Sequence, residues 1–290
     1  MSEMIRIENL NKTYGKARGV IDLNLLVEEG EIYGFMGPNG AGKSTTIRSL
    51  LGLIQPTGGK AYIFGKECTK EKNDILNRIG YMPSETTFYK GMKVRDVISF
   101  SAGLRGKDCK KEAELLCERL KLDTSRKVEQ LSLGNRKKVA IVCAMQHAPE
   151  LYIFDEPTSG LDPLIQKEFF DLILEKNKAG ATFFLSSHVL SEVKRYCTRA
   201  AIIKEGRLIA EDSVEHLIHT SARKITVTGI EEVPQALREN AKQIKHEQNQ
   251  LRFLYQGDSR ALMQSLSAEA VTDVLIEEPD MEEIFLHYYQ

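Results

Sequence analysis

Long apolar runs are absent from this sequence, and so is tryptophan. The 290-residue chain has no uncharged apolar stretch that approaches the ~20 residues needed by a membrane-spanning helix. Its first residues, 1–6, also lack an apolar signal segment. We therefore expect a cytoplasmic protein whose role at a membrane, if it has one, depends on a partner chain.

Cysteine is sparse and shows no metal-binding or disulfide pattern. The five cysteines lie at positions 68, 109, 117, 143 and 197, and no two of them form a C-x-x-C pair. An odd number of scattered cysteines favours free thiols in a reducing compartment over a disulfide framework or a zinc site.

Strong net charge is missing too, but the charge is unevenly distributed. The formal net charge is −1, which argues against a general binding surface for nucleic acid. Residues 222–290 contain 7 Lys and Arg against 12 Asp and Glu, whereas the rest of the chain contains 33 against 29. This shift predicts a boundary near residue 221, between a domain of residues 1–220 and a smaller one of residues 222–290.

One stretch of the first domain has the composition of a phosphate-binding loop. It consists of Gly37, Pro38, Asn39, Gly40, Ala41, Gly42, Lys43, Ser44 and Thr45. The spacing fits G-x-x-x-x-G-K-[ST], in which backbone amides surround phosphates, the lysine meets the β- and γ-phosphates, and the hydroxyl after it reaches Mg²⁺. Because a strand precedes the loop and a helix follows it, we expect the chain to bind a nucleoside triphosphate.

The first domain alternates strands with helices. Apolar runs at residues 31–36, 151–154 and 181–186 predict buried strands, and residues 43–54 predict a helix that ends before Pro56. Residues 84–147 show helical periodicity with little strand signal, which predicts a helical insert. A helix is also predicted over residues 163–177, with Asp162 as its N-cap and Pro163 at its first position. The alternation favours an α/β fold with a mostly parallel sheet.

The second domain is expected to be a small α+β unit. Strands are predicted at residues 225–227, 251–255 and 271–276, and helices at residues 259–266 and 281–289.

Two of the buried strands are followed by residues suited to catalysis. Asp155 and Glu156 follow the strand at 151–154, and the carboxyl edge of such a sheet is where ligands bind. Asp155 can hold Mg²⁺, and Glu156 can act as general base on a water. His188 follows the strand at 181–186, where it would face the γ-phosphate. A lone histidine is also common on surfaces and in cores, so its position alone leaves both interpretations open.

Taken together, these features resemble the ATP-binding subunit of ABC transporters over residues 4–220. Residues 37–45 match the Walker A motif of that family, 151–156 its Walker B motif, 131–135 its signature, 159–162 its D-loop, and His188 its switch histidine. The resemblance implies the P-loop NTPase fold, with ATP and Mg²⁺ as ligands and Ser44 and Asp155 on the metal. It also implies a catalytic site formed by Lys43, Glu156 and His188.

The resemblance further implies a dimer, of identical or different subunits, in which the signature of one subunit closes over phosphates held by the other. Ser132, Gly134 and Asp162 would then lie at the nucleotide, and Tyr14 would stack on adenine. Read from the residues alone, Ser132 is equally suited to cap a helix that begins at Asn135, and Tyr14 to pack at the end of a strand.

Three departures from the family pattern affect the expected turnover. The signature has Leu133 and Asn135 where the family has glycine and glutamine. Ser84, followed by Glu85, stands where the family has the glutamine of its Q-loop. We expect slow hydrolysis by the isolated subunit and stimulation by a partner.

Residues 277–289 resemble the end of ATPase subunits from antibiotic-, bacteriocin- and drug-type exporters, although a simple amphipathic closing helix explains them nearly as well. The resulting hypothesis is an ATP-hydrolysing motor subunit that is bound at the inner face of the membrane through a separate permease and drives export. The alternatives are a soluble ABC ATPase with no transport role and a weakly hydrolysing ATP sensor.

Overall fold

The computed structural model describes residues 2–15, 17–219, 223–247 and 249–277. The chain divides into two compact units, residues 1–214 and 215–290, and the division falls at the start of the short helix α8 (Val214–His219). Among the described residues, no helix combines the length and the apolar character required to cross a membrane.

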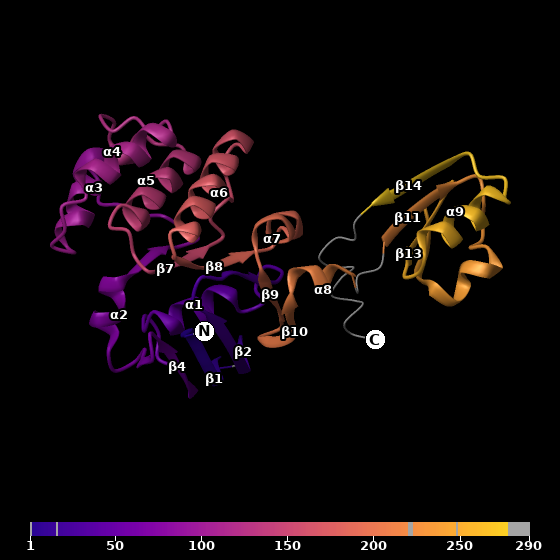
Figure 1. The fold of residues 1–290 in the computed structure, drawn as a ribbon, viewed down its shortest axis with the longest axis horizontal. Coiled ribbons are helices and arrows are strands. Elements are labelled where there is room, and N and C mark those ends of the chain that lie inside the picture. The colour runs from indigo at the N-terminus through magenta and orange to yellow at the C-terminus, as the bar shows by residue number, and fades with distance from the viewer. Residues whose placement is uncertain (1, 16, 220–222, 248, 278–290) are drawn as a thin grey trace. The chain divides into compact units, whose positions relative to one another are not determined.

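A six-stranded sheet forms the centre of the first unit (Figure 1). Its strands, in spatial order, are β10 (Arg207–Ser213), β9 (Arg199–Lys204), β3 (Ile32–Met36), β8 (Thr182–Ser187), β7 (Leu151–Asp155) and β6 (Ile79–Met82). All neighbouring pairs are parallel except β10 and β9, which form an antiparallel hairpin. The sequence therefore predicted the mostly parallel sheet correctly.

The central strands are apolar on both sides because both faces of the sheet are covered. Along β7, Tyr152 and Phe154 pack into one hydrophobic cluster, whereas Leu151 and Ile153 pack into another. This alternation explains why the run carries no polar side chain before Asp155. The acids that follow are thereby delivered to the carboxyl edge of the sheet.

An antiparallel sheet and helix α1 lie on one side of the central sheet (Figure 1). The antiparallel strands, in spatial order, are β2 (Ala17–Glu28), β1 (Glu3–Tyr14), β4 (Gly58–Ile63) and β5 (Lys66–Glu67). Leu10, Val20 and Ile63 from this sheet share a buried cluster with Phe35 and Phe184 of the central sheet. The strand that leads into the phosphate loop, β3, is thus firmly packed against the antiparallel sheet.

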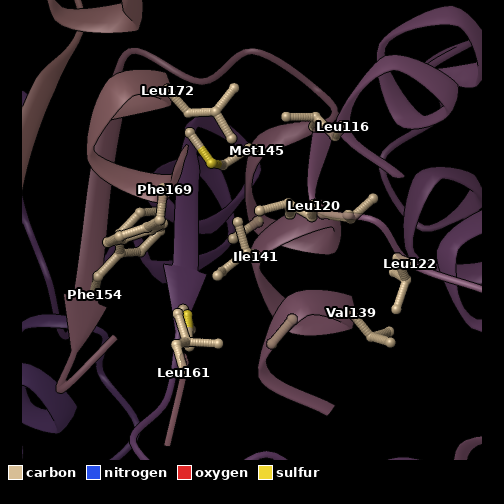
Figure 2. Packing of buried hydrophobic residues seen from close by; sticks show 14 of the residues in the cluster. Leu116, Leu120, Leu122, Val139, Ile141, Met145, Phe154, Leu161, Phe169 and Leu172 are labelled. Atoms are coloured by element: carbon tan, nitrogen blue, oxygen red, sulfur yellow. The ribbon is translucent and has the colours of Figure 1, made fainter. Parts of the chain in front are cut away.

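Helices cover the other side of the central sheet. They are α3 (Val94–Gly103), α4 (Lys110–Arg119), α5 (Leu133–Met145) and α6 (Pro163–Lys178). Figure 2 shows Ile141 and Met145 of α5 in the cluster that also contains Phe154 of β7 and Phe169 of α6. The predicted helical insert is present, and its core is continuous with one face of the sheet.

The smaller elements of the first unit connect these layers. They are α2 (Lys72–Arg78), the 3₁₀ turn η1 (Val128–Gln130) and α7 (Leu190–Tyr196).

Helix α1 is shorter than the sequence predicted, since it spans Lys43–Leu50 and does not reach residue 54. Gly52 adopts φ of 60°, a left-handed conformation that ends the helix. The Gly52 amide donates to the Ser49 carbonyl at 3.0 Å, and the Leu53 amide donates to the Arg48 carbonyl at 2.8 Å. This pair of bonds is a Schellman cap, so Gly52 and not Pro56 sets the end of the helix.

The second unit is an antiparallel sheet with helices packed on it. Its strands, in spatial order, are β12 (Ala241–Glu247), β13 (Gln250–Tyr255), β11 (Arg223–Thr228) and β14 (Asp273–Glu277). Leu262 and Leu266 of α9 (Ser259–Ser267), with Leu237 of the 3₁₀ turn η2 (Gln235–Asn240), pack on Val227 and Phe253. Strand β12 was not predicted, and the helix expected at 281–289 lies outside the described residues.

Candidate active site

The loop between β3 and α1 has the geometry of a phosphate cradle. Gly40 and Gly42 have φ of 79° and 111°, the left-handed region that glycine enters without strain. A Cβ on Gly37 would lie 2.4 Å from the Ile203 carbonyl oxygen, so only glycine fits there. Helix α1 begins at Lys43 with no side-chain cap, which leaves the amides at its start free to meet an anion.

Lys43 is buried and turned into this loop. Its Nζ donates to the carbonyl oxygens of Gly37 at 2.6 Å and Pro38 at 3.2 Å. The same ammonium lies 3.0 Å from Oε1 of Glu156. The direction of this last contact does not meet hydrogen-bond geometry, so it is an ion pair. The cation of the loop and the acid after β7 therefore meet directly.

Glu156 lies between Lys43 and His188. Its Oε2 lies 2.7 Å from Nδ1 of His188, which places the histidine predicted from the end of β8 at the acid. The Glu156 amide donates to the Oγ of Ser186 at 3.0 Å, and its carbonyl accepts from the Nζ of Lys137. The three predicted catalytic residues, Lys43, Glu156 and His188, are thus in one connected group.

Asp155 ends β7 as a buried acid, with 2% of its surface exposed. The Ser186 hydroxyl donates to its Oδ1 at 2.5 Å. Burial, and next the negative charge of Asp155, raise the pKa of Tyr81 to about 12.

The described residues contain no group of three or more His, Cys, Asp or Glu arranged to hold a metal ion. A Mg²⁺ ion would suit the oxygens of Ser44 and Asp155 and would take its remaining ligands from phosphate and water.

The signature residues contact the D-loop of the same chain. Ser132 caps α5, because its Oγ accepts from the Asn135 amide at 3.3 Å. Helix α5 begins at Leu133, so the expected start at Asn135 was wrong and Gly134 lies in the first turn. A Cβ on Gly134 would lie 2.6 Å from the Gly160 carbonyl oxygen. The signature and the D-loop therefore approach each other so closely that only glycine fits at position 134.

Asp162 and Tyr14 make other contacts within the first unit. Asp162 caps α6, accepting from the Ile165 amide at 3.1 Å, as its place before Pro163 predicted. Tyr14 ends β1 and is 44% exposed, with the Lys12 ammonium 5.1 Å from the centroid of its ring. The ring is therefore accessible for stacking.

Sequence reasoning missed Lys137 and Ser186, which hold the backbone of Glu156. Ser186 is a serine inside an apolar strand and gave no signal of its own. Lys137 is the middle one of three consecutive basic residues, 136–138, so the sequence did not set it apart, although only 1% of its surface is exposed.

Comparisons with known proteins agree with this geometry. Residues 20–159 match the family model described as ABC transporter. The bacitracin transport ATP-binding protein of Bacillus licheniformis is 42% identical over 221 residues, covering 75% of this chain and 72% of that protein. The linearmycin resistance ATP-binding protein of Bacillus subtilis strain 168 is 32% identical, covering 98% of this chain and 97% of that protein.

A solved structure described as the ATP-binding subunit of an ABC transporter is 30% identical, with a TM-score of 0.69, and covers 74% of this chain and 91% of that chain. A dimeric bacterial ABC transporter cassette is 25% identical, with a TM-score of 0.66, and covers 73% of this chain and 99% of that chain. Family model, curated relatives and fold agree: the chain belongs to the ABC transporter family, as one of its ATP-binding, ATP-hydrolysing subunits.

Proposed function

We propose that this subunit drives export through a separately encoded membrane permease, to which it binds at the inner face of the membrane. The proposal is supported by two curated relatives, because one is named for bacitracin transport and the other for linearmycin resistance. Compounds such as bacitracin and linearmycin are the cargo that these names suggest. The subunit would act as a dimer, with itself or with a related chain, that closes on ATP and reopens after hydrolysis.

We assign the roles within the site from the contacts of Lys43, Glu156 and His188. Lys43 binds the β- and γ-phosphates, Ser44 and Asp155 hold Mg²⁺, and Glu156 polarises the attacking water as general base. His188 orients Glu156 and faces the γ-phosphate. Mg²⁺, when bound, neutralises phosphate charge.

The rest of the nucleotide would be bound outside this group. Tyr14 would stack on adenine. Ser132 and Gly134 of the partner subunit would cover the phosphates, with Asp162 at the interface.

The single observation that carries the catalytic proposal is the position of Glu156 between a buried lysine and a histidine. Its Oε1 lies 3.0 Å from Lys43 Nζ, and its Oε2 lies 2.7 Å from His188 Nδ1. Incoming phosphates would compete with Glu156 for the Lys43 ammonium. Oε1 would then be freed to accept a proton from water, while His188 keeps the other oxygen in place.

Glu156→Gln tests this proposal, because it removes the base and preserves the shape of the side chain. We expect ATP binding at least as tight as in the wild type, because the neutral amide no longer competes with phosphate for the Lys43 ammonium, and a hydrolysis rate lower by about 10²-fold or more. Glu150→Gln is the matched control, since Glu150 precedes β7 but pairs with Arg78 on the surface. Hydrolysis by Glu156→Gln at the rate of the control would show that Glu156 is not the base.

The two alternatives from the sequence have less support. A soluble ATPase without a transport role does not agree with relatives named for transport and resistance. Only the departures from the family motifs at Ser84 and Leu133 favour a weakly hydrolysing sensor. Measurement of the ATP hydrolysis rate distinguishes such a sensor from a motor subunit.

A further inference from the structure

Lys137 is a buried cation that no nucleotide motif explains. It lies on α5, in the second turn after the Ser132 cap, and only 1% of its surface is exposed. Its Nζ donates to the main-chain carbonyl of Glu156. Burial lowers the pKa of this ammonium, and the charges of Glu156, Asp155 and Glu192 act against that shift.

The peptide groups on both sides of Glu156 are held. On the amino side, the Glu156 amide donates to Ser186, through Oγ at 3.0 Å and the main-chain carbonyl at 3.3 Å. On the carboxyl side, the carbonyl is held by Lys137. Glu156 itself adopts φ of 49°, a left-handed conformation that is unfavourable for a residue with a Cβ and persists only when its surroundings fix it.

We propose that Lys137 is a positioning residue for ATP hydrolysis: it fixes the backbone turn at Glu156 and connects that turn to the helix that begins with the signature. The proposal rests on the general-base role assigned to Glu156. Ser132 and Lys137 are five residues apart on one helix, a rise of about 7.5 Å. A shift of the signature during dimer closure therefore also moves Lys137, which holds the main-chain carbonyl of Glu156 in the same chain.

A lysine with a purely structural role leads to a different expectation. Lys137→Met leaves the main-chain carbonyl of Glu156 without its donor, so a purely structural role predicts a loss of stability of about 1–3 kcal/mol with turnover per folded molecule unchanged. If Lys137 positions Glu156, the folded variant loses turnover as well.

The test measures steady-state ATP hydrolysis, ATP affinity and urea unfolding of the full chain for Lys137→Met. The control is Lys138→Met, the neighbouring buried lysine. We expect Lys137→Met to lower kcat by about 10- to 100-fold with KM nearly constant, the size expected for a misplaced catalytic group. Lys138→Met should stay within about twofold of the wild type, since a substitution away from the catalytic contacts changes little.

The double variant Lys137→Met/Glu156→Gln gives a readout that loss of stability cannot imitate. If Lys137 acts through Glu156, adding Lys137→Met to Glu156→Gln causes no further loss. A further loss as large as that in the wild-type background would overturn the proposal, as would a kcat of Lys137→Met equal to that of Lys138→Met. Should Lys137→Met fail to fold, Lys137→Gln serves instead, because its amide is polar but one atom too short to reach the carbonyl.

The outcomes distinguish this inference from the proposed function. If Glu156→Gln hydrolyses ATP like the wild type, the assignment of the base is wrong and the inference falls with it. If Glu156→Gln is impaired and Lys137→Met is not, only the role of Lys137 is wrong.

Discussion

Lys43 and Glu156 form an ion pair across the site, with Nζ 3.0 Å from Oε1, although they are 113 residues apart in the sequence. The two side chains are 5% and 15% exposed, so water screens the contact only weakly. Phosphates that bind in the loop would draw the ammonium away from the carboxylate. Nucleotide binding and release of the base are therefore expected to be linked through this one pair.

The first prediction concerns Lys43. Lys43→Ala removes the loop cation, and a hydrogen bond to a charged group contributes about 1.5–3 kcal/mol. ATP affinity should therefore fall by about 10- to 100-fold, as measured by titration calorimetry. Lys66→Ala, which removes a lysine that pairs with Asp74 away from the loop, is the control and should bind like the wild type. Near wild-type affinity of Lys43→Ala would contradict the cradle assignment.

The second prediction concerns the composite site. Ser132→Arg places a bulky charge where the signature of one subunit is proposed to approach the other. The Glu156→Gln protein should form dimers with ATP, and adding Ser132→Arg should abolish them in sedimentation experiments. Because Ser132 also caps α5, Ser132→Ala serves as control: it removes the cap, at a cost of about 1 kcal/mol, without adding bulk. Equal dimer content in the Ser132→Arg protein would refute a composite site.

The sequence was informative wherever local chemistry decides the structure. The glycines of the phosphate loop, the apolar run of β7 and the Asp162-Pro163 start of α6 each act through neighbouring residues, and the structure bears out each of them. The end of α1 was also encoded locally, in Gly52. It was missed because Pro56 was taken as the stop, although the left-handed cap ends the helix four residues earlier.

The features that sequence reasoning missed depend on contacts between distant segments. Strand β12 contains a lysine at both 242 and 245 and little apolar surface, because it is an edge strand paired only with β13. Lys137 and Ser186 meet Glu156 across 19 and 30 residues of sequence. A single sequence shows which side chains are present, but it does not show which of them the fold brings to one backbone turn.

The third prediction concerns pH and His147, to which the sequence assigned no role. Its Nε2 lies 3.1 Å from the Ile79 carbonyl, and burial, followed by the charge of Arg105, lowers the pKa of His147 to about 4. The unfolded chain, with a histidine pKa near 6.5, binds this proton at higher pH than the folded one. The stabilising contribution of neutral His147 is therefore complete above pH 6.5 and is lost as the pH falls towards 4.

Between pH 7 and pH 5 this linkage should cost the wild type about 2 kcal/mol in free energy of unfolding. His147→Gln keeps a donor for the Ile79 carbonyl but does not titrate, so its loss over the same interval should be smaller by about that amount. Urea unfolding at the two pH values measures the difference. His246→Gln, on an exposed strand, should behave like the wild type, and an identical pH dependence for His147→Gln would disprove the assignment.

The last prediction concerns the role of the second unit. This unit has its own buried cluster, which includes Ile225, Val227, Leu251 and Phe253, whereas both large clusters of the first unit lie within residues 4–203. Lys43, Glu156 and His188 also belong to the first unit. We therefore expect a chain truncated after Ser221 to fold and to bind ATP with unchanged affinity.

The same truncation should impair assembly. At about 70 residues, a small unit gains stability from a neighbour, and we predict that this unit steadies the assembled complex. Residues 281–288 lie outside the described residues. Their sequence places apolar side chains at i, i+3, i+4 and i+7, as on one face of a helix, and we include this segment in the predicted role. ATP-dependent dimerisation and permease-stimulated hydrolysis should both weaken in the truncated chain. If both are unchanged, the second unit has no role in assembly, whereas loss of ATP binding would mean that the boundary lies elsewhere.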